Sequence, residues 1–237
     1  MINSYDSGLG LAALIMAALG FKFMFRYAKF WGRERVLNSP YLNGADEQRA
    51  TRNYHLAKEL LRRNEFNGAL RYLQEAEQNL AASGIQNLPL SAGIFAQQAL
   101  CYLRGNIGAS SERQALSLVE RACDIAALSG RDKVKLDALF ARASVRNALG
   151  MTNDSEDDLR SCIELARKIY GKNSEREGRL LNNLALIMFQ HGQLQDALDC
   201  YRLALPILES HTGHDSHLTQ QARDGQVEVL KRLNGYS

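Results

Sequence analysis

The sequence predicts an all-α protein, in which four helical hairpins stack into a solenoid that ends in a capping helix and is preceded by a single transmembrane helix. The first observation is a motif that recurs four times, with a small residue at Ala57, Ala99, Ala143 and Ala185, at steps of 42, 44 and 42 residues. Self-similarity at this period is typical of helical-hairpin solenoids. The second observation is an apolar run near the N-terminus, which predicts the membrane segment.

The second half of each unit carries three small or apolar residues, spaced by four and then three positions. This spacing places them on one face of an α-helix, where small side chains let two helices approach closely. The four sets are Ala69, Leu73, Ala76; Ala115, Val119, Ala122; Ser155, Leu159, Cys162; and Ala197, Tyr201, Ala204. Gly150 and Gly192 precede the last two sets and suit a tight turn, because glycine reaches positive φ without steric cost. Asn64 holds the same place in the first unit.

The fourth unit supports a family resemblance through Leu181-Asn182-Asn183-Leu184-Ala185, Gly192, Ala197, Tyr201, Ala204-Leu205 and Gly213-His214-Asp215. With these residues, the region from about 50 to 213 resembles the tetratricopeptide repeat (TPR), and in particular the kinesin-light-chain variety. The second unit departs from the pattern, because its turn at 105–108 is longer. The resemblance implies a TPR solenoid that binds other proteins.

The repeat pattern divides the chain into a membrane and juxtamembrane helix (1–35), a linker (36–45), four repeats (46–213) and a C-terminal capping helix (214–237). Pro206 is expected to kink or shorten the helix that contains it. Asp215 and Ser216 are expected N-caps of the last helix. The expected helices are 46–63, 67–83, 91–104, 111–128, 134–149, 153–170, 177–191, 194–210 and about 216–234.

Residues 8–25 contain only one charged side chain, Lys22, and would span about 27 Å as a helix, which suffices for a hydrocarbon core. Basic residues follow this run and none precedes it, so the positive-inside rule places the N-terminus outside and the TPR body in the cytoplasm. A bacterial inner membrane is the first expectation and a mitochondrial membrane the alternative. Two other interpretations stay open, namely a hydrophobic helix packed on the solenoid and a mitochondrial targeting helix.

Residues 1–35 contain five basic and two acidic side chains, so this segment accounts for the whole net charge of +3. A nucleic-acid binder needs a basic excess on its folded body, so the composition argues against nucleic acid as a partner. The basic and aromatic side chains after the apolar run are expected to contact lipid headgroups, although a dock for an acidic partner is the alternative. These side chains are Lys22, Arg26, Lys29, Trp31 and Arg33.

No motif of catalysis, of cofactor binding or of metal binding stands out, so we expect a protein that is not an enzyme and has no cofactor. Four cysteines lie singly in repeat helices and are interpreted as core residues in a reducing compartment. His211, His214 and His217 fall across an expected loop and are not interpreted as a metal site. The acidic run from Asp154 to Asp158 is interpreted as the solvated start of a helix.

The TPR resemblance implies that the first helix of each hairpin lines a concave groove. The groove residues carried over from the family are Tyr54, Lys58, Arg62, Gln97, Arg104, Phe140, Ser144, Asn147, Arg179, Asn182, Asn183 and Phe189. Asn183 is expected to hydrogen-bond the backbone of a ligand, because its amide both donates and accepts. Tyr54 and Phe140 occupy places where TPRs that bind chaperone tails carry charge, which argues against that ligand.

The function expected from these features is that of a membrane-anchored TPR scaffold or assembly factor. Its groove would bind an extended or helical segment of a protein that belongs to a membrane-associated complex. The alternatives are a structural subunit of a large membrane complex, of the secretion, pilus or respiratory type, and an organellar import or assembly receptor. Gly8, Gly10 and Gly20 would favour the subunit, because small residues permit close helix contact in lipid.

Overall fold

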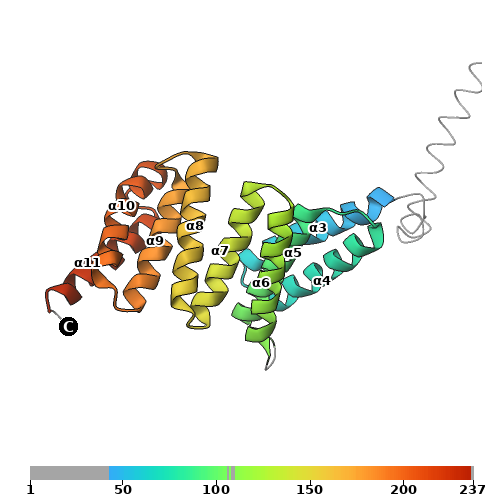
Figure 1. Cartoon of the computed structure of the whole chain (residues 1–237), viewed down its shortest axis with the longest axis horizontal. Coiled ribbons are helices and arrows are strands. Elements are labelled where there is room, and N and C mark those ends of the chain that lie inside the picture. The colour runs from blue at the N-terminus through green and yellow to red at the C-terminus, as the bar shows by residue number, and fades with distance from the viewer. Residues whose placement is uncertain (1–42, 106, 108–109, 236–237) are drawn as a thin grey trace, which may run out of the picture.

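The computed structural model describes residues 43–105, 107 and 110–235. These residues form nine helices, joined by short turns, and contain no strand. Figure 1 shows that the helices stack side by side in chain order. Their ends lie close to those expected from the repeat pattern, so the all-α solenoid is confirmed for this part of the chain. The helices are α3 (Asn43–Arg62), α4 (Phe66–Ser83), α5 (Leu88–Gly105), α6 (Ser111–Leu128), α7 (Asp132–Ala148), α8 (Thr152–Tyr170), α9 (Glu175–Gln190), α10 (Leu194–Thr212) and α11 (His217–Leu233).

The hairpins are the pairs α3–α4, α5–α6, α7–α8 and α9–α10, and α11 packs mainly on α10. The small and apolar residues of the repeated motif lie between the helices, and none of its sixteen positions is more than 2% exposed. Alanine at these positions, for example Ala57 and Ala185, leaves room for the facing helix. The recurring spacing in the sequence is therefore the spacing of the helix contacts.

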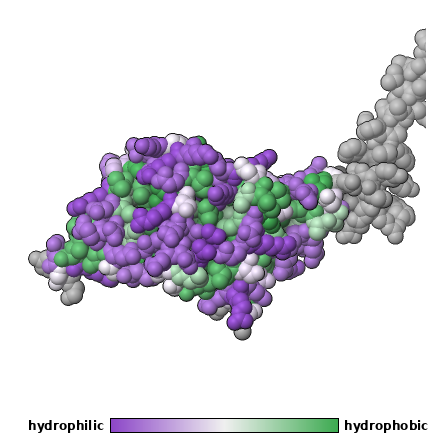
Figure 2. Space-filling model, in the orientation of Figure 1, coloured by the Kyte–Doolittle hydropathy of each residue, from purple (hydrophilic) through white to green (hydrophobic). Residues whose placement is uncertain are grey.

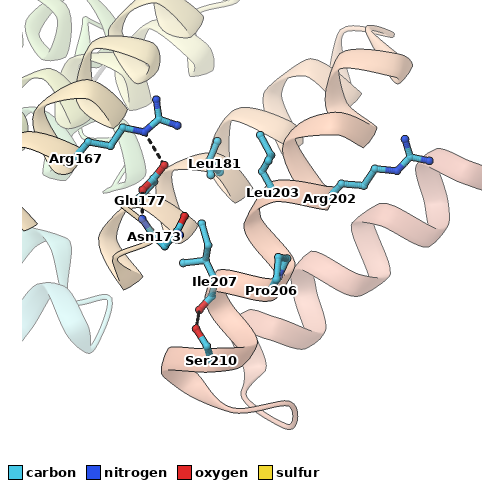
Figure 3. Close-up of a pocket in the computed structure, with 9 residues that line it drawn as sticks. All are labelled: Arg167, Asn173, Glu177, Leu181, Arg202, Leu203, Pro206, Ile207 and Ser210. Atoms are coloured by element: carbon cyan, nitrogen blue, oxygen red, sulfur yellow. Dashed lines mark hydrogen bonds and ion pairs between the residues drawn. The ribbon is translucent and has the colours of Figure 1, made fainter. Parts of the chain in front are cut away.

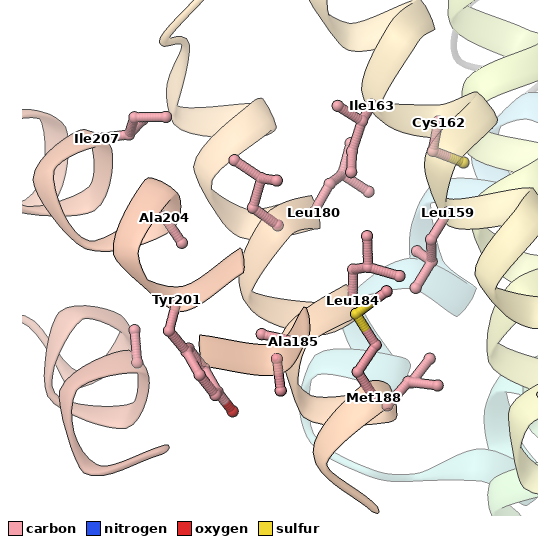
Figure 4. Packing of buried hydrophobic residues seen from close by; sticks show 14 of the residues in the cluster. Leu159, Cys162, Ile163, Leu180, Leu184, Ala185, Met188, Tyr201, Ala204 and Ile207 are labelled. Atoms are coloured by element: carbon pink, nitrogen blue, oxygen red, sulfur yellow. The ribbon is translucent and has the colours of Figure 1, made fainter. Parts of the chain in front are cut away.

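Figure 4 shows this packing in the last two hairpins, where Leu180, Leu184 and Met188 of α9 lie between side chains of α8 and α10. Tyr201 of α10 is 2% exposed. It packs against α11 at Gly225, where a Cβ atom would collide with the Tyr201 hydroxyl. A glycine at this position of α11 thus makes room for the largest fully buried side chain among the described residues.

The short turns inside the hairpins have the predicted backbone. Asn64, Gly150 and Gly192 all have positive φ, between 60° and 78°. The expectation that Pro206 shortens its helix is wrong, because α10 continues through Pro206 to Thr212. The interpretation of Ser216 as an N-cap is confirmed, since its side-chain oxygen accepts a hydrogen bond from the Thr219 backbone at 3.1 Å.

The interpretation of 154–158 as a solvated helix start is wrong for Asp158, which is 4% exposed. Its carboxylate accepts hydrogen bonds from Arg142, at 2.6 and 3.0 Å, and from Arg146 at 3.0 Å. Both arginines also reach Glu120, so a four-residue ion network joins α6, α7 and α8. Glu156 is also buried, at 8% exposed. Asp154 and Asp157 are exposed on the surface, whereas Glu156 and Asp158 are buried against the neighbouring helices.

The predicted membrane helix (1–35) and most of the linker lie outside the described residues, and so do Lys22, Arg26, Lys29, Trp31 and Arg33. Within 43–105, 107 and 110–235, no helix combines the length and the apolar composition that a bilayer crossing requires.

Candidate functional site

The first helices of the four hairpins form one face of the solenoid, which we call the first-helix face (α3, α5, α7 and α9). A cleft of about 240 Å³ opens on this face. Small residues of α5 and α7, such as Gly93 and Ala138, form part of its lining and leave it hollow. The full lining is Tyr54, Lys58, Pro89, Ala92, Gly93, Ala96, Gln97, Leu100, Val134, Asp137, Ala138, Phe140, Ala141 and Arg176.

Two aromatic rings of the cleft lining each face a cation. The Lys58 ammonium lies 5.6 Å from the centre of the Tyr54 ring. The Arg176 guanidinium lies 5.5 Å from the centre of the Phe140 ring. Such contacts hold a cation over an aromatic face while its remaining N–H groups stay available. Tyr54 is seated against α5 because Gly93 has no side chain, since a Cβ there would lie 2.8 Å from the Tyr54 hydroxyl oxygen.

Asp137 is the acidic residue of the cleft lining, and Arg176 donates to it at 3.1 Å. Partial desolvation raises the pKa of the Asp137 carboxyl, against the opposing effect of Arg176, Lys133 and Lys58, although the Asp137 side chain is 59% exposed. Burial also raises the pKa of Tyr54, with a smaller contribution from Asp137. The cleft therefore offers cations, an aromatic surface and one carboxylate, which suits the binding of a polar chain with acidic groups.

Four polar atoms on α7 and α9 are buried and have no hydrogen-bond partner among the described residues. They are Arg146 Nε, Asn147 Oδ1, Arg176 Nε and Asn182 Oδ1. A buried polar group without a partner costs about 1–3 kcal/mol. Of these four residues, Arg176 is the one that lines the cleft.

The structure brings together some of the groove residues predicted from the sequence and separates others. Tyr54, Lys58 and Gln97 line the cleft, as does Phe140. Arg62 and Arg104 are exposed and lie outside its lining, and Arg62 pairs with Glu59 at 2.8 Å.

On α9, Arg179 pairs with Glu175 at 2.7 Å, and Asn183 is half-buried. Asn182 is only 2% exposed, so the expectation that its amide faces an open groove is wrong for this structure. Neighbouring side chains enclose it instead. The binding roles of the predicted residues stay predictions.

Sequence reasoning missed Asp137 and Arg176. Both lie within the face that the periodicity defines, since Asp137 precedes Phe140 by three positions and Arg176 precedes Asn183 by seven. The missed signal is this helical spacing. The repeat pattern placed the expected start of the helix at 177, whereas α9 begins at Glu175 and includes Arg176 in its first turn.

A second hollow, of about 330 Å³, lies among α8, α9 and α10 and is shown in Figure 3. Glu177 accepts hydrogen bonds from Arg167 Nε and from the Asn173 backbone N–H, both at 2.7 Å. Both carboxylate oxygens are thus used within the fold, where they fasten the α8–α9 loop to the start of α9. Leu181 and Leu203 form an apolar wall beside them. We therefore regard the cleft on the first-helix face as the candidate site.

Two of the three histidines around the α10–α11 loop, His211 and His214, have separate contacts. His211 Nε2 lies 2.8 Å from the Asn173 carbonyl oxygen, and His214 Nδ1 lies 3.3 Å from Glu209. Among the described residues, no group of three or more His, Cys, Asp or Glu side chains is placed to hold a metal ion.

Comparisons with known proteins agree with this architecture. The family model for the tetratricopeptide repeat matches residues 135–210, about a third of the chain. The crystal structure of BtubC (BKLC) from P. vanneervenii has a TM-score of 0.66 at 19% identity, over 94% of this chain and 83% of that one. A putative kinesin light chain from Podosopora anserina, with nearly identical TPR-like repeats, has a TM-score of 0.63 at 16% identity, over 79% of this chain and 87% of that one.

No curated protein matches this chain. At these identities, the two structures show a shared fold and no more. Tetratricopeptide repeats generally mediate protein–protein interaction. Residues 135–210 are therefore tetratricopeptide repeats, and the nine helices of the described residues have the fold of a TPR-like solenoid.

Proposed function

We propose that this chain is a membrane-anchored scaffold that holds an extended segment of a partner protein in the cleft on its first-helix face. The proposal that the chain binds a partner rests on the cleft itself, in which Lys58 and Arg176 lie against aromatic rings. Cations held in this way, beside an aromatic surface, suit an extended chain with acidic side chains.

The membrane part of the proposal rests on the sequence. The apolar run of residues 8–25 is followed by four basic residues up to position 35 and is preceded by none. This arrangement predicts a single-pass anchor with the repeats on the cytoplasmic side. A membrane location would bring the cleft to the partner's complex, which is the role of an assembly factor or scaffold.

The binding part is tested with the full chain, purified by affinity in mild detergent, and with identification of the bound proteins by mass spectrometry. The test variant is the double substitution Lys58→Ala and Arg176→Ala, and the matched control is Arg160→Ala on the second helix α8. The double variant is expected to lose most of the captured partner, at least about tenfold, which corresponds to about 1.4 kcal/mol. The control is expected to retain it.

Thermal unfolding of each variant separates a binding defect from a folding defect. Asn183→Ala extends the test along α9, and it should weaken capture while leaving the melting temperature nearly unchanged. If the double variant captures the partner as well as Arg160→Ala does, the cleft is not the binding site. Equal loss of capture and of folding in Asn183→Ala argues against a binding role for that residue.

The membrane part is tested separately by carbonate extraction and by flotation with vesicles. An integral protein stays in the membrane pellet at alkaline pH, and a chain that is released into the supernatant contradicts the anchor. Accessibility of cysteines introduced on α11 and near position 3 then reports the side of the membrane on which each part lies.

A further inference from the structure

One edge of the solenoid is formed by the loops that connect successive hairpins, and we call it the loop edge. It comprises the start of α3 and the loops α4–α5, α6–α7 and α8–α9. Asn87 donates a hydrogen bond to Glu47 at 2.7 Å, which places the α4–α5 loop beside the start of α3. Lys168 pairs with Asp132 at 2.6 Å, which joins the end of α8 to the start of α7. Figure 1 shows the α6–α7 and α8–α9 loops along the same side of the stack.

Large apolar side chains are exposed at this edge. Leu128, at the end of α6, is 76% exposed, more than any other large apolar side chain in the described part of the chain. Tyr170 and Ile85 are 45% and 37% exposed. Leu128 and Ile85 also line an apolar cleft of about 610 Å³ between α4, α5 and α6. On the face that Figure 2 shows, green apolar patches interrupt the hydrophilic exterior.

Cations flank these apolar residues. Arg131, Lys133, Lys135 and Lys172 are exposed, and none of them forms an ion pair with another described residue. Segments 128–135 and 168–176 each carry a net charge of +2. The turns at the opposite ends of the same hairpins, 147–154 and 190–196, each carry −1. On the loop edge, the positive charge therefore lies at the α6–α7 and α8–α9 loops, whereas the start of α3 carries Asp46 and Glu47.

The chain also reaches the solenoid at this edge. Residues 36–42 separate α3 from the proposed anchor and its basic flank, and seven residues span at most about 25 Å even when fully extended. The start of α3 must then lie close to the bilayer if the anchor is correct. An exposed apolar group beside unpaired cations is the combination that suits an anionic lipid surface.

We infer that the loop edge rests on an anionic lipid surface, with Leu128 and Tyr170 at headgroup depth and the four cations beside the phosphates. This inference rests in part on the proposed anchor. It adds the orientation of the solenoid, because contact along the loop edge holds the helices upright and leaves the first-helix face open to a partner from the side.

The test uses a fluorophore attached to a single introduced cysteine in the full chain, reconstituted into vesicles that contain nitroxide-labelled headgroups. The reporting position is Ala127→Cys on the loop edge, and the matched control is Ala148→Cys at the opposite edge. Both alanines are exposed and lie at helix ends.

The four native cysteines do not compete for the label. Burial raises the pKa of Cys101 and Cys162 to about 12 and that of Cys123 to about 11, and it also raises the pKa of Cys200. The native thiols therefore react slowly with the label.

In vesicles of phosphatidylcholine with phosphatidylserine, lipid nitroxide is expected to quench the label at 127 several-fold more than the label at 148. Each cation near an anionic surface raises the equilibrium constant for contact with the lipid by about fivefold. The triple variant Lys133→Glu, Lys135→Glu and Lys172→Glu should therefore reduce contact about a hundredfold and abolish the difference. Vesicles of phosphatidylcholine alone should give the same result as the triple variant.

Flotation of the same samples separates this inference from the anchor. If the chain floats and the two labels are quenched equally, the anchor stands and the loop-edge contact is overturned. If quenching at 127 is unaffected by the triple variant, the cations do not meet lipid, and an acidic protein is their partner instead. A chain that floats only with anionic lipid, with quenching at 127, supports the loop edge and contradicts the anchor.

Discussion

The ion network around Asp158 gives the sharpest prediction for stability, because a conservative substitution removes its central charge. Asp158 is 4% exposed and accepts three hydrogen bonds from Arg142 and Arg146. Hydrogen bonding to Asp158 raises the pKa of Arg142, so the Arg142 guanidinium stays charged beside Asp158. The substitution Asp158→Asn keeps the volume and leaves two guanidinium groups that have lost their buried partner.

The size of the effect follows from the burial of the groups. Removal of one partner from a fully buried ion pair costs about 3–5 kcal/mol. Here the arginine side chains are 20% and 17% exposed, and both keep their contact with Glu120, which is 41% exposed. Partial solvation and the remaining partner lower the expected loss to about 2–3 kcal/mol. For a folded region of this size, that loss corresponds to a decrease in melting temperature of about 5–10 °C.

Asp157→Asn is the matched control, since Asp157 is the preceding residue of α8 and is exposed. It changes the same charge at nearly the same distance from the helix start, and a surface substitution of this kind costs at most about 0.5 kcal/mol. Chemical denaturation of the two variants, followed by circular dichroism, measures both losses. Equal losses would refute the reasoning, because the burial of Asp158 would then contribute nothing.

Three other predictions concern packing, pH and thiol chemistry. Gly225→Ala should destabilise the protein by about 1–3 kcal/mol, because the Cβ of the new alanine collides with Tyr201. Gly44→Ala is the control and should not destabilise the protein, since the space around Gly44 is open. Thermal melts compare the two variants. A hydrogen bond from Arg223 lowers the pKa of Glu209. This contact therefore stabilises the α10–α11 packing above the unfolded pKa of about 4.5, and the stabilisation is lost as the pH falls through the folded pKa. Hydrogen exchange in α11 should increase in that pH range, and Glu209→Gln should remove this pH dependence. Cysteine alkylation at neutral pH should be slow in the folded protein and fast in denaturant, as followed by mass spectrometry, and fast labelling of the folded chain would contradict the burial of these thiols.

The helices, their order and the hairpin turns were predictable from the sequence because local spacing determines them. Alanine at positions such as Ala57 and Ala185 recurs wherever two helices touch, and glycine recurs where the backbone has positive φ. These are short-range constraints, so a single sequence displays them. The same periodicity placed Tyr54, Lys58 and Gln97 on the face where the cleft opens.

The contacts between hairpins were not predictable in this way. Arg142 and Glu120 are 22 positions apart, and Arg176 and Asp137 are 39 positions apart. Nothing in the local sequence indicates that these side chains meet, because the meeting depends on how each hairpin is rotated against the next. The burial of Asn182 has the same origin, since a helical wheel gives the face of α9 but not the neighbours that cover it.

The sequence by itself determined that the chain folds as stacked helical hairpins, because each hairpin is specified by residues within about forty positions of one another. Only the tertiary structure decided which acidic residues are buried, which of the predicted groove residues share a cleft, and which edge carries exposed leucine beside unpaired cations. These properties arise from the angles between hairpins. Small changes in those angles alter side-chain burial while leaving the repeat pattern untouched, so the pattern alone does not specify them.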